Sequence, residues 1–322
     1  LAMTLPVWAR VHGAPLFRAI IRATPEEFDV SEELGYEFDG NGEHDFLYVE
    51  KVGTNTEWLS RQLADFADVP VRDVGYSGLK DRHAVTRQWF SVPRWNSPDW
   101  SLVDIEGASI LEQARHSKKL RRGAHKSNRF KIVLRGKLPD SDLLEERIRM
   151  IVMMGVPNYY GEQRFGREGG NIQLANDWAA GKRLPRHKRS IAISSARSFL
   201  FNERLNEKAL DGSWNHLTSG DLANLDGTGS IFSVDDVDSE IERRCAEMDI
   251  HPAGELACDG SQCGNETWQN AFDKARVKPA SRSLRLRVID LQVETGNQCA
   301  KLYFKLGRGA FATSVLREIA DY

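Results

Sequence analysis

The sequence predicts an α+β fold in which strands from both ends of the chain share one sheet. Alternating apolar and polar residues, which are typical of strands, gather toward the two ends of the chain, and helical patterns occupy much of the segment between them. The composition, with 41% hydrophobic and 28% charged residues among 322, is that of a folded globular protein. Strands that flank a group of helices indicate an α+β architecture.

The N-terminal part of the chain supplies strands and one helix. Alternating apolar stretches between Val7 and Val30 predict strands, and "DFLYVEKV" at residues 45–52 predicts another. Thr56 stands where an N-cap is expected, ahead of the amphipathic pattern "EWLSRQLADFA". We therefore expect a helix that begins directly after Thr56.

A further strand and helix follow. In "RFKIVLRG", residues 129–136, alternate side chains from Phe130 onward share one face of a strand. The segment "DLLEERIRMIVMMG", residues 142–155, has helical periodicity and places Gly155 where a C-cap is expected.

The C-terminal part predicts a hairpin and a short helix. The strand candidates "LRLRVIDLQV" (residues 284–293) and "KLYFKL" (residues 301–306) are separated by the turn "ETGNQ", and "SVLREIA" closes the chain as a helix. We expect this hairpin to pair in the same domain as residues 45–52 and 129–135.

The middle of the chain differs in texture and indicates a second domain, for which 322 residues leave room. Residues 158–277 contain few strong strands, helical stretches such as "SSARSFLFNERLNEKAL", and a long polar part. We expect a largely helical domain at residues 158–277, inserted into a discontinuous domain formed by residues 3–157 and 278–322.

The charge is segregated along the chain. The net charge is only −2, but "RHSKKLRRGAHKSNRFK", residues 115–131, holds eight Lys or Arg and no acid. A second basic run, "GKRLPRHKR", spans residues 181–189, while acids gather elsewhere. Any single run of this kind is explained equally well by a solvated charged face. Two such runs favour a basic surface that binds a polyanion.

Several classes of protein are excluded by what the chain lacks. No apolar run approaches the roughly 20 residues of a membrane span, and the N-terminus has no signal-peptide pattern, so we expect a cytosolic protein. Four cysteines do not make a disulfide framework. Cys258 and Cys263 lack a second pair of ligands at zinc spacing, so we expect free thiols and no metal site.

The stretch "GYSGLKDRHAVTRQWFSV", residues 75–92, presents a single carboxylate among cations. Its glycines predict a turn and "QWFSV" a strand, so Asp81 lies at a loop between ordered elements, where functional groups are often displayed. Neighbouring cations favour the ionised form of an aspartate, which can then act as nucleophile or base. The alternative is an ordinary turn aspartate that bonds its own backbone.

This stretch resembles the signature of the TruD family of tRNA pseudouridine synthases. Other segments resemble that family in the same order, among them "EEFDVSEEL", "KVGTNT", "GVPNYYGEQRFGREGGN" and "GAFATSVLRE". The resemblance runs from about Phe28 to Arg317 and is weak over residues 211–282.

The resemblance implies a pseudouridine synthase catalytic domain with a mixed, mainly antiparallel sheet and an inserted domain specific to the family. It also implies an activity, the isomerisation of uridine 13 in the D-arm region of tRNA to pseudouridine. Neither a cofactor nor a metal is implied. Because the target base must leave its stack to react, the site needs groups that hold a flipped base.

Site residues are implied by the same motifs. Asp81 matches the catalytic carboxylate, as nucleophile or base, and Lys80 lies against it in support. The resemblance places four residues at the substrate: Phe28, Asn128, Phe130 and Phe311. An amide suits the edge of uracil and Phe130 would stack on the base, although each phenylalanine could instead be plain core.

The basic run carries the expected RNA contacts, and its histidines have no catalytic role in this interpretation. We expect five of its residues to bind RNA: Lys118, Lys119, Arg121, Arg122 and Lys126. We interpret His116 and His125 as RNA-facing or structural.

Two other functions compete with this one. The chain could be a pseudouridine synthase that acts on another RNA, or an RNA-binding module without activity. A pure binding module has no need of a carboxylate that repels phosphate, and the chain has no large accessory segment, so tRNA is the expected partner. We expect no protein partner, no membrane association and a monomer.

Overall fold

The computed structural model of the chain describes residues 5–256 and 265–322. It forms two compact units. Unit 1 contains Leu1–Pro15, Arg149–Arg287 and Ala310–Ile319, and unit 2 contains Leu16–Ile148, Val288–Gly309 and Ala320–Tyr322. Cys258 and Cys263 lie outside the described residues, whereas Cys245 and Cys299 are free thiols.

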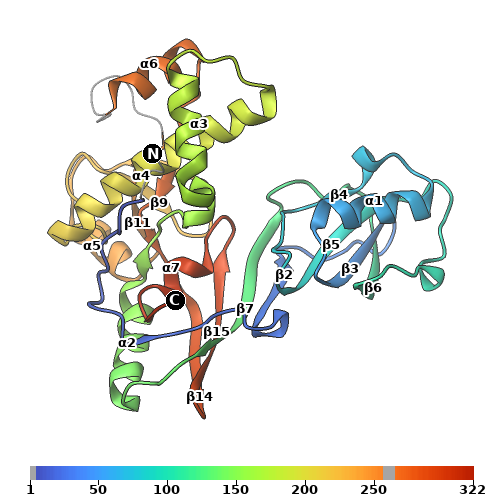
Figure 1. Ribbon diagram of the computed structural model, residues 1–322, viewed down its shortest axis with the longest axis horizontal. Coiled ribbons are helices and arrows are strands. Elements are labelled where there is room, and N and C mark those ends of the chain that lie inside the picture. Colours follow the sequence, from blue (N-terminus) through green and yellow to red (C-terminus); the bar gives the residue numbers. More distant parts are fainter. Residues whose placement is uncertain (1–4, 257–264) are drawn as a thin grey trace. The chain divides into compact units, whose positions relative to one another are not determined.

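Unit 2 is built on an eight-stranded mixed sheet (Figure 1). Its strands are β2 (Phe28–Leu34), β3 (His44–Val52), β4 (Gly75–Tyr76), β5 (Val85–Pro93), β6 (Ala108–His116), β7 (His125–Arg135), β14 (Ile289–Gly296) and β15 (Cys299–Gly307). The order is β14-β15-β7-β2-β5-β3-β6, with β4 paired to β5. Only the β2–β5 pair is parallel within this sheet. The α+β class and the mixed, mainly antiparallel sheet are thus confirmed.

The C-terminal hairpin belongs to this sheet. β14 pairs with β15, and β15 pairs with β7, so the hairpin shares the sheet that also contains β3, as expected. The strand predicted over residues 284–293 is divided, because β13 (Arg285–Leu286) pairs instead with β8 (Val156–Pro157) in unit 1. The short β16 (Ala320–Asp321) pairs in parallel with β1 (Phe17–Arg18).

One helix covers part of the sheet. The apolar face of α1 (Thr56–Ala67) packs on β3 and β5, with Leu59 and Leu63 against Leu47 and Phe90. Burial of such side chains contributes roughly 1.5–3 kcal/mol each. The prediction of Thr56 as N-cap was wrong: Asn55 caps the helix, and its side chain accepts from the Trp58 amide at 2.6 Å.

The strands predicted between Val7 and Val30 are only partly formed. β1 and the start of β2 lie in this range, whereas residues 7–16 are not in strands. Side chains satisfy their backbone donors instead, since the Ala9 amide donates to Asn206 and the Val11 amide to Glu318. The prediction of strand over residues 7–16 was therefore wrong.

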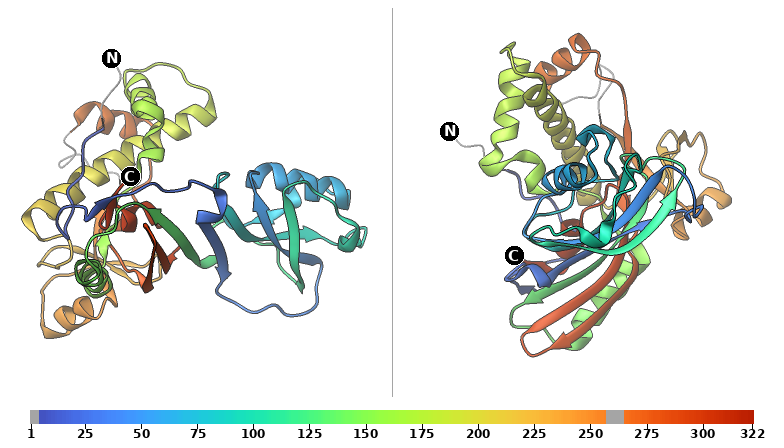
Figure 2. Two further views of the ribbon diagram at one scale, coloured as in Figure 1. Left: turned by 60° about the horizontal axis from the view of Figure 1, so that its bottom comes forward. Right: turned by 90° about the vertical axis from the view of Figure 1, so that its right-hand side faces the viewer.

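Unit 1 combines helices with short strands. Its helices are α3 (Gly170–Ala179), α4 (Arg186–Asp211), α5 (Ser239–Ala246), α6 (Glu266–Lys274) and α7 (Ala312–Leu316). Figure 2 shows α3 and α4 side by side in both views, with α6 next to α3. A four-stranded antiparallel sheet accompanies them, in the order β10 (Ile231–Ser233), β9 (Leu222–Leu225), β11 (Ile250–Glu255), β12 (Ser281–Ser283).

Helix α2 (Ser141–Met154) confirms the prediction for residues 142–155. Gly155 follows it with φ of 74°, and its amide donates to the carbonyl of Ile151 at 2.8 Å. A side chain at this position would also collide with the backbone of Leu286. Glycine is therefore required both by the positive φ and by this close approach.

Short 3-10 helices complete the structure: η1 (Pro25–Glu27), η2 (Val71–Asp73), η3 (Trp100–Leu102), η4 (Glu162–Phe165) and η5 (Arg167–Gly169). Among the helices of the described residues, none is both long enough and apolar enough to span a bilayer.

Candidate active site

Asp81 lies on the loop between β4 and β5 in unit 2, as the sequence predicts. Its side chain is 43% exposed, and its Oδ2 lies 3.0 Å from Nη2 of Arg22. The Arg22 guanidinium also sits over the ring of Phe28, 4.0 Å from the ring centroid. Arg22 has φ of 58°, a backbone conformation that is uncommon for a residue with a side chain and that occurs often at functional sites. The carboxylate is thus accessible and has one cationic partner at hand.

The backbone of this loop is held by a buried lysine. Lys51, at the end of β3, has no solvent exposure, and its Nζ donates to the carbonyl of Thr54 at 2.8 Å and to that of Asp81 at 2.9 Å. Burial lowers the pKa of Lys51 to about 8, against the opposing effect of the Asp81 charge. Lys51 therefore fixes where the Asp81 carboxylate is displayed.

Lys80 points to a different acid. Its Nζ lies 2.6 Å from Oε2 of Glu32, and both side chains are almost completely buried. Glu32 also accepts from the backbone amide of Trp89 at 3.2 Å. A buried ion pair of this kind loses several kcal/mol when one partner is removed, so it anchors the residue next to Asp81.

The hydroxyl of Thr56 also holds this loop. Thr56 is the first residue of α1, and its Oγ1 donates to Gln88 at 2.8 Å and accepts from the Lys80 amide at 3.0 Å. The N-terminus of α1 thus helps to position the segment that leads into Asp81.

The substrate-binding candidates of unit 2 lie on one face of the sheet. The register pairs Glu32 with Asn128 and Val30 with Phe130, and side chains two residues apart on a strand share a face. Phe28, Asn128 and Phe130 therefore project to the same side as Glu32. The sheet brings these predicted residues together as the sequence suggests.

Asn128 has unused hydrogen-bonding capacity. Its Nδ2 lies 3.3 Å from Nε2 of His125, whereas its buried Oδ1 has no partner within the described residues. An unsatisfied buried oxygen costs roughly 1–3 kcal/mol and calls for an explanation, such as a ligand donor.

The two aromatic candidates are buried in this structure. Phe130 stacks on Phe304 of β15 with ring centroids 5.1 Å apart, and Phe28 is only 2% exposed. Both rings border the face that carries Asn128. Both rings are therefore packed in the core in this structure, and their stacking on a flipped base stays a prediction.

His125 and His116 are held by protein contacts. His125 is buried, with Nδ1 2.5 Å from Ser77 Oγ, and burial together with the charge of Lys80 lowers its pKa. His116 lies 3.2 Å from Asp39 and stacks on Tyr36. These contacts agree with the structural reading of both histidines.

The basic run joins β6 to β7 and is fastened to the segment that precedes Lys80. The Gly123 amide donates to the carbonyl of Ser77 at 2.8 Å, and the guanidinium of Arg122 lies over the ring of Tyr76 at 3.7 Å. A side chain at Gly75 would meet the carbonyl oxygen of Leu120, which shows how closely the two segments approach.

The expected RNA-binding side chains differ in their availability. Lys118, Arg121, Arg122 and Lys126 are exposed, whereas Lys119 is partly buried. Lys119 donates to the carbonyl of Arg72 and Arg122 to the hydroxyl of Tyr76, each at 2.5 Å. The exposed side chains thus form a positive surface on the connection between β6 and β7. This connection packs against the segment that leads into the Asp81 loop.

Phe311 belongs to unit 1, where it precedes α7 and lines a cavity with Arg164. Four further residues of unit 2 were not predicted as site residues: Arg22, Glu32, Lys51 and Thr56. One of these carried a signal, because Lys51 interrupts the apolar face of the strand predicted over residues 45–52. Within the described residues, no three His, Cys, Asp or Glu side chains gather as a metal site would require.

Comparisons with known proteins agree on one family. The chain matches the family model "tRNA pseudouridine synthase D (TruD)" over residues 11–175 and 171–319. It is 40% identical to the tRNA pseudouridine synthase D of Methylococcus capsulatus over 97% of this chain and 94% of the relative. The protein of that name from Aeromonas hydrophila is 42% identical over 97% of this chain and 93% of its own length.

The fold is shared with a solved structure. A protein from Methanosarcina mazei, described as a tRNA pseudouridine synthase D, superposes with a TM-score of 0.71 over 98% of this chain and 95% of its own. The two chains are 18% identical, so this likeness concerns the fold alone.

Proposed function

Because the chain belongs to the TruD family of tRNA pseudouridine synthases, we propose that it converts uridine 13 in the D-arm region of tRNA to pseudouridine, with Asp81 as the catalytic carboxylate. The observation that carries the proposal is the display of Asp81. Its carboxylate is accessible on a loop whose backbone is fixed from beneath by Lys51. A turn aspartate without function has no need of such support.

The reaction moves one base without gain or loss of atoms. The bond between N1 and C1′ breaks, the uracil turns, and C5 bonds to C1′. C5 gives up its proton and N1 acquires one. An anionic carboxylate assists either as a nucleophile toward the sugar or the base, or as the base that removes a proton.

The neighbouring cation suits either role. Arg22 pairs with Asp81 at 3.0 Å and is itself held over Phe28. It keeps the free carboxylate oriented, and it can release that oxygen when the substrate arrives. Lys80, bound to Glu32, supports the loop rather than pairing with Asp81.

Asn128 and the aromatic residues supply the base-binding part of the proposal. The unpartnered Oδ1 of Asn128 can accept from the imide N–H of uracil, and its amide can donate to a carbonyl. Phe130 and Phe28, on the same face of the unit 2 sheet, would then lie against the ring. The target uridine must leave its stack to reach these groups.

Replacement of Asp81 by asparagine tests the catalytic assignment. Asp81→Asn keeps the size of the side chain and removes its charge, so we expect single-turnover formation of pseudouridine to fall by a factor on the order of 10⁴. Binding of tRNA should be unchanged or slightly tighter, because one anion near the phosphates is gone. Asp104→Asn, at an exposed aspartate of the same unit, is the matched control and should react at the native rate.

Two results would refute the assignment. One is a near-native rate in Asp81→Asn with a native melting temperature. The other is a loss of rate that follows only from a loss of folded protein.

The position of the target is tested separately. Pseudouridine mapping on total RNA from cells with and without the gene should show the loss of one tRNA signal, at uridine 13. Loss of a signal in another RNA would instead favour a pseudouridine synthase of different specificity. No change in any RNA, together with retained RNA binding, would favour a binding module without activity.

A further inference from the structure

Two neighbouring cavities in unit 1 open along the N-terminal half of α4. One has a volume of about 430 Å³ and is bordered by η4, α3, α4 and the residues around Phe311. The other, of about 220 Å³, is bordered by Tyr160, Arg197 and Leu256. Both are lined by Ser190 and Ser194, so we treat them as one concave surface, the α4 groove.

The α4 groove is positively charged. Arg164 and Arg197 are the charged members of its lining, and none of the described lining residues is acidic. The helix itself opens with "RHKR" at residues 186–189, all exposed, and has no acid before Glu203. Arg282 adds a cation, with its guanidinium 4.3 Å from the centroid of the Tyr160 ring.

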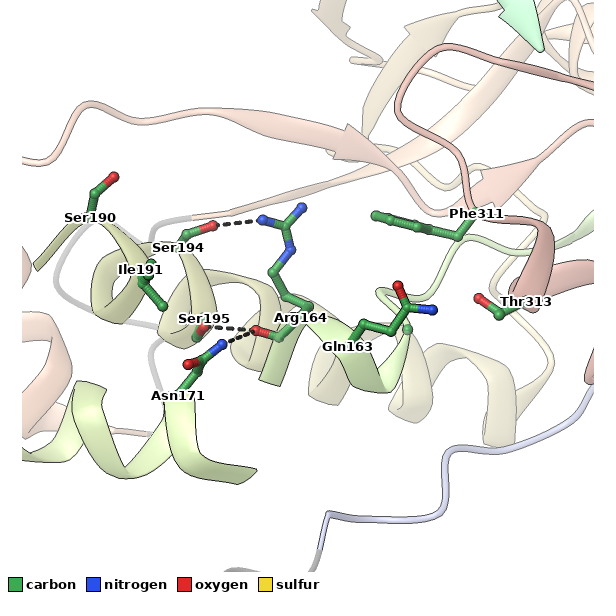
Figure 3. Close-up of a pocket in the computed structure, with 10 residues that line it drawn as sticks. Gln163, Arg164, Asn171, Ser190, Ile191, Ser194, Ser195, Phe311 and Thr313 are labelled. Atoms are coloured by element: carbon green, nitrogen blue, oxygen red, sulfur yellow. Dashed lines mark hydrogen bonds between the residues drawn. The ribbon is translucent and has the colours of Figure 1, made fainter. Parts of the chain in front are cut away.

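Arg164 is held in place but not neutralised. Its Nη1 lies 3.1 Å from Ser194 Oγ, and Figure 3 shows the guanidinium extending from η4 toward that hydroxyl, with Phe311 on its other side. The Tyr160 ring lies 5.2 Å from it. Within the described residues Arg164 has no carboxylate at ion-pair distance.

Arg197 lies one helical turn after Ser194 in α4. Like Arg164, it has no carboxylate at ion-pair distance within the described residues. Its Nη2 makes one long contact, 3.4 Å, with the carbonyl of Lys278. Its Nε is buried and has no hydrogen-bond partner among the described residues. A guanidinium offers five N–H donors, so most of this capacity is unused. Two half-buried arginines that have no carboxylate partner among the described residues are costly unless an anion binds them.

We propose that the α4 groove binds a backbone phosphate of the RNA through Arg164, Ser194 and Arg197. A phosphodiester matches the fork of a guanidinium and accepts from hydroxyl groups. The inference rests on the proposed function only in taking an RNA as the substrate, and it assigns to unit 1 a phosphate contact of its own.

The double variant Arg164→Gln/Arg197→Gln tests the site. We expect its Kd for tRNA to rise at least tenfold, and the slope of log affinity against log salt to decrease by about 1, as for the loss of one phosphate contact. Single-turnover rate at saturating tRNA should stay within about threefold of native, because Asp81 is untouched. This rate separates failure of the site from failure of the proposed function.

Two comparisons distinguish a specific site from general loss of charge. Arg243→Gln/Arg244→Gln removes the same charge from the same unit, at arginines already paired with acids in or beside α5, and should bind like the native protein. Arg164→Lys/Arg197→Lys keeps both charges and should retain most of the affinity. If the glutamine variant does not fold by its melting curve, Ser194→Asp keeps both arginines, places an anion in the groove and should weaken binding likewise.

Three outcomes would overturn the proposal. The first is native affinity and salt slope in the glutamine variant. The second is an equal loss in the Arg243→Gln/Arg244→Gln control. The third, where the glutamine variant does not fold, is native affinity in Ser194→Asp.

Discussion

Lys51 is a cation with no solvent exposure and, among the described residues, no carboxylate at ion-pair distance, which is a costly arrangement. Its ammonium instead bonds the carbonyls of Thr54 and Asp81, one from each of the two loops that meet at the end of β3. A neutral side chain of the same length could fill the space but could not join these loops. The cost of burial is therefore best explained by the position it imposes on Asp81.

We predict that Lys51→Met lowers kcat and leaves KM nearly unchanged. Methionine fills a similar volume, but the two carbonyls lose their donor and the Asp81 loop is free to shift. A displacement of about 1 Å in a catalytic group can cost on the order of 10² in rate. Steady-state assays on the target tRNA give both constants. A variant with native kcat would show that Lys51 serves only the fold.

The same variant has a characteristic dependence of stability on pH. Lys51 holds its proton less tightly in the folded protein, with a pKa near 8, than in the unfolded chain, where it is ordinary. Between about pH 8 and 10.5 the unfolded state binds more protons, so this contribution to the free energy of unfolding rises with pH. The native protein should gain stability relative to Lys51→Met across that range. Denaturant melts of both proteins at several pH values measure the difference, and a constant difference would contradict the shifted pKa.

Individual site residues could be predicted to different degrees. Asp81 was identified because its loop carries a recognisable motif, and its accessible position agrees with that reading. Lys51 could have been found, since it occupies the inward position that follows Leu47 and Val49 on a predicted strand. Arg22 could not, because its contact with Asp81 joins segments 59 residues apart and depends on a positive φ that no local pattern announces.

The N-cap of α1 illustrates the same limit for a whole element. The helix was predicted from its apolar face, but Asn55 and Thr56 are both good cap residues, and local sequence does not choose between them. The choice is made by tertiary contacts, because the Thr56 hydroxyl is taken by Gln88 and by the amide of Lys80. Asn55 is then left to satisfy the open end of the helix.

We predict that Asn55→Ala destabilises the protein by about 1 kcal/mol, the usual cost of losing an N-cap. The Trp58 amide loses its acceptor at 2.6 Å, and the loop from Gly53 that supports Lys51 is loosened. Asn55→Asp keeps an acceptor and adds a charge that favours the helix dipole, so it should be at least as stable as native. Chemical denaturation compares the three proteins. Equal stability of the alanine and native proteins would mean that the cap contributes nothing.

Other elements show where pattern and environment diverge. The C-terminal hairpin was predictable because both strands alternate and the turn is short. Residues 7–16 alternate as well, yet their amides bond side chains of Asn206 and Glu318 rather than a neighbouring strand. Alternation reports a surface that is half buried, and it does not say whether the partner is a strand or a set of polar side chains.

For the molecule as a whole, net charge is a poor guide to what it binds. The chain has 44 basic and 46 acidic side chains, and many of the acids form ion pairs outside the basic run, such as Glu32 with Lys80 and Asp29 with Arg87. The run between β6 and β7 contains no acid, and its exposed members lie on a segment bonded to the turn before Lys80. Beyond a Debye length of about 8 Å at physiological salt, an RNA phosphate responds to this local surface more than to the total charge.

We predict that tRNA affinity falls steeply with salt and that part of this dependence comes from the basic run. Neutralising Lys118, Lys119, Arg121 and Arg122 to Gln should decrease the slope by about 2 rather than 4, because the Lys119 and Arg122 side chains are held at the Arg72 carbonyl and the Tyr76 hydroxyl and are less free to reach a phosphate. Binding titrations at several salt concentrations measure the slope. The control neutralises four exposed cations outside the run: Arg61, Lys137, Arg243 and Lys301. It changes net charge equally and should keep the native slope. Equal slopes in both variants would mean that total charge, and not the basic run, governs binding.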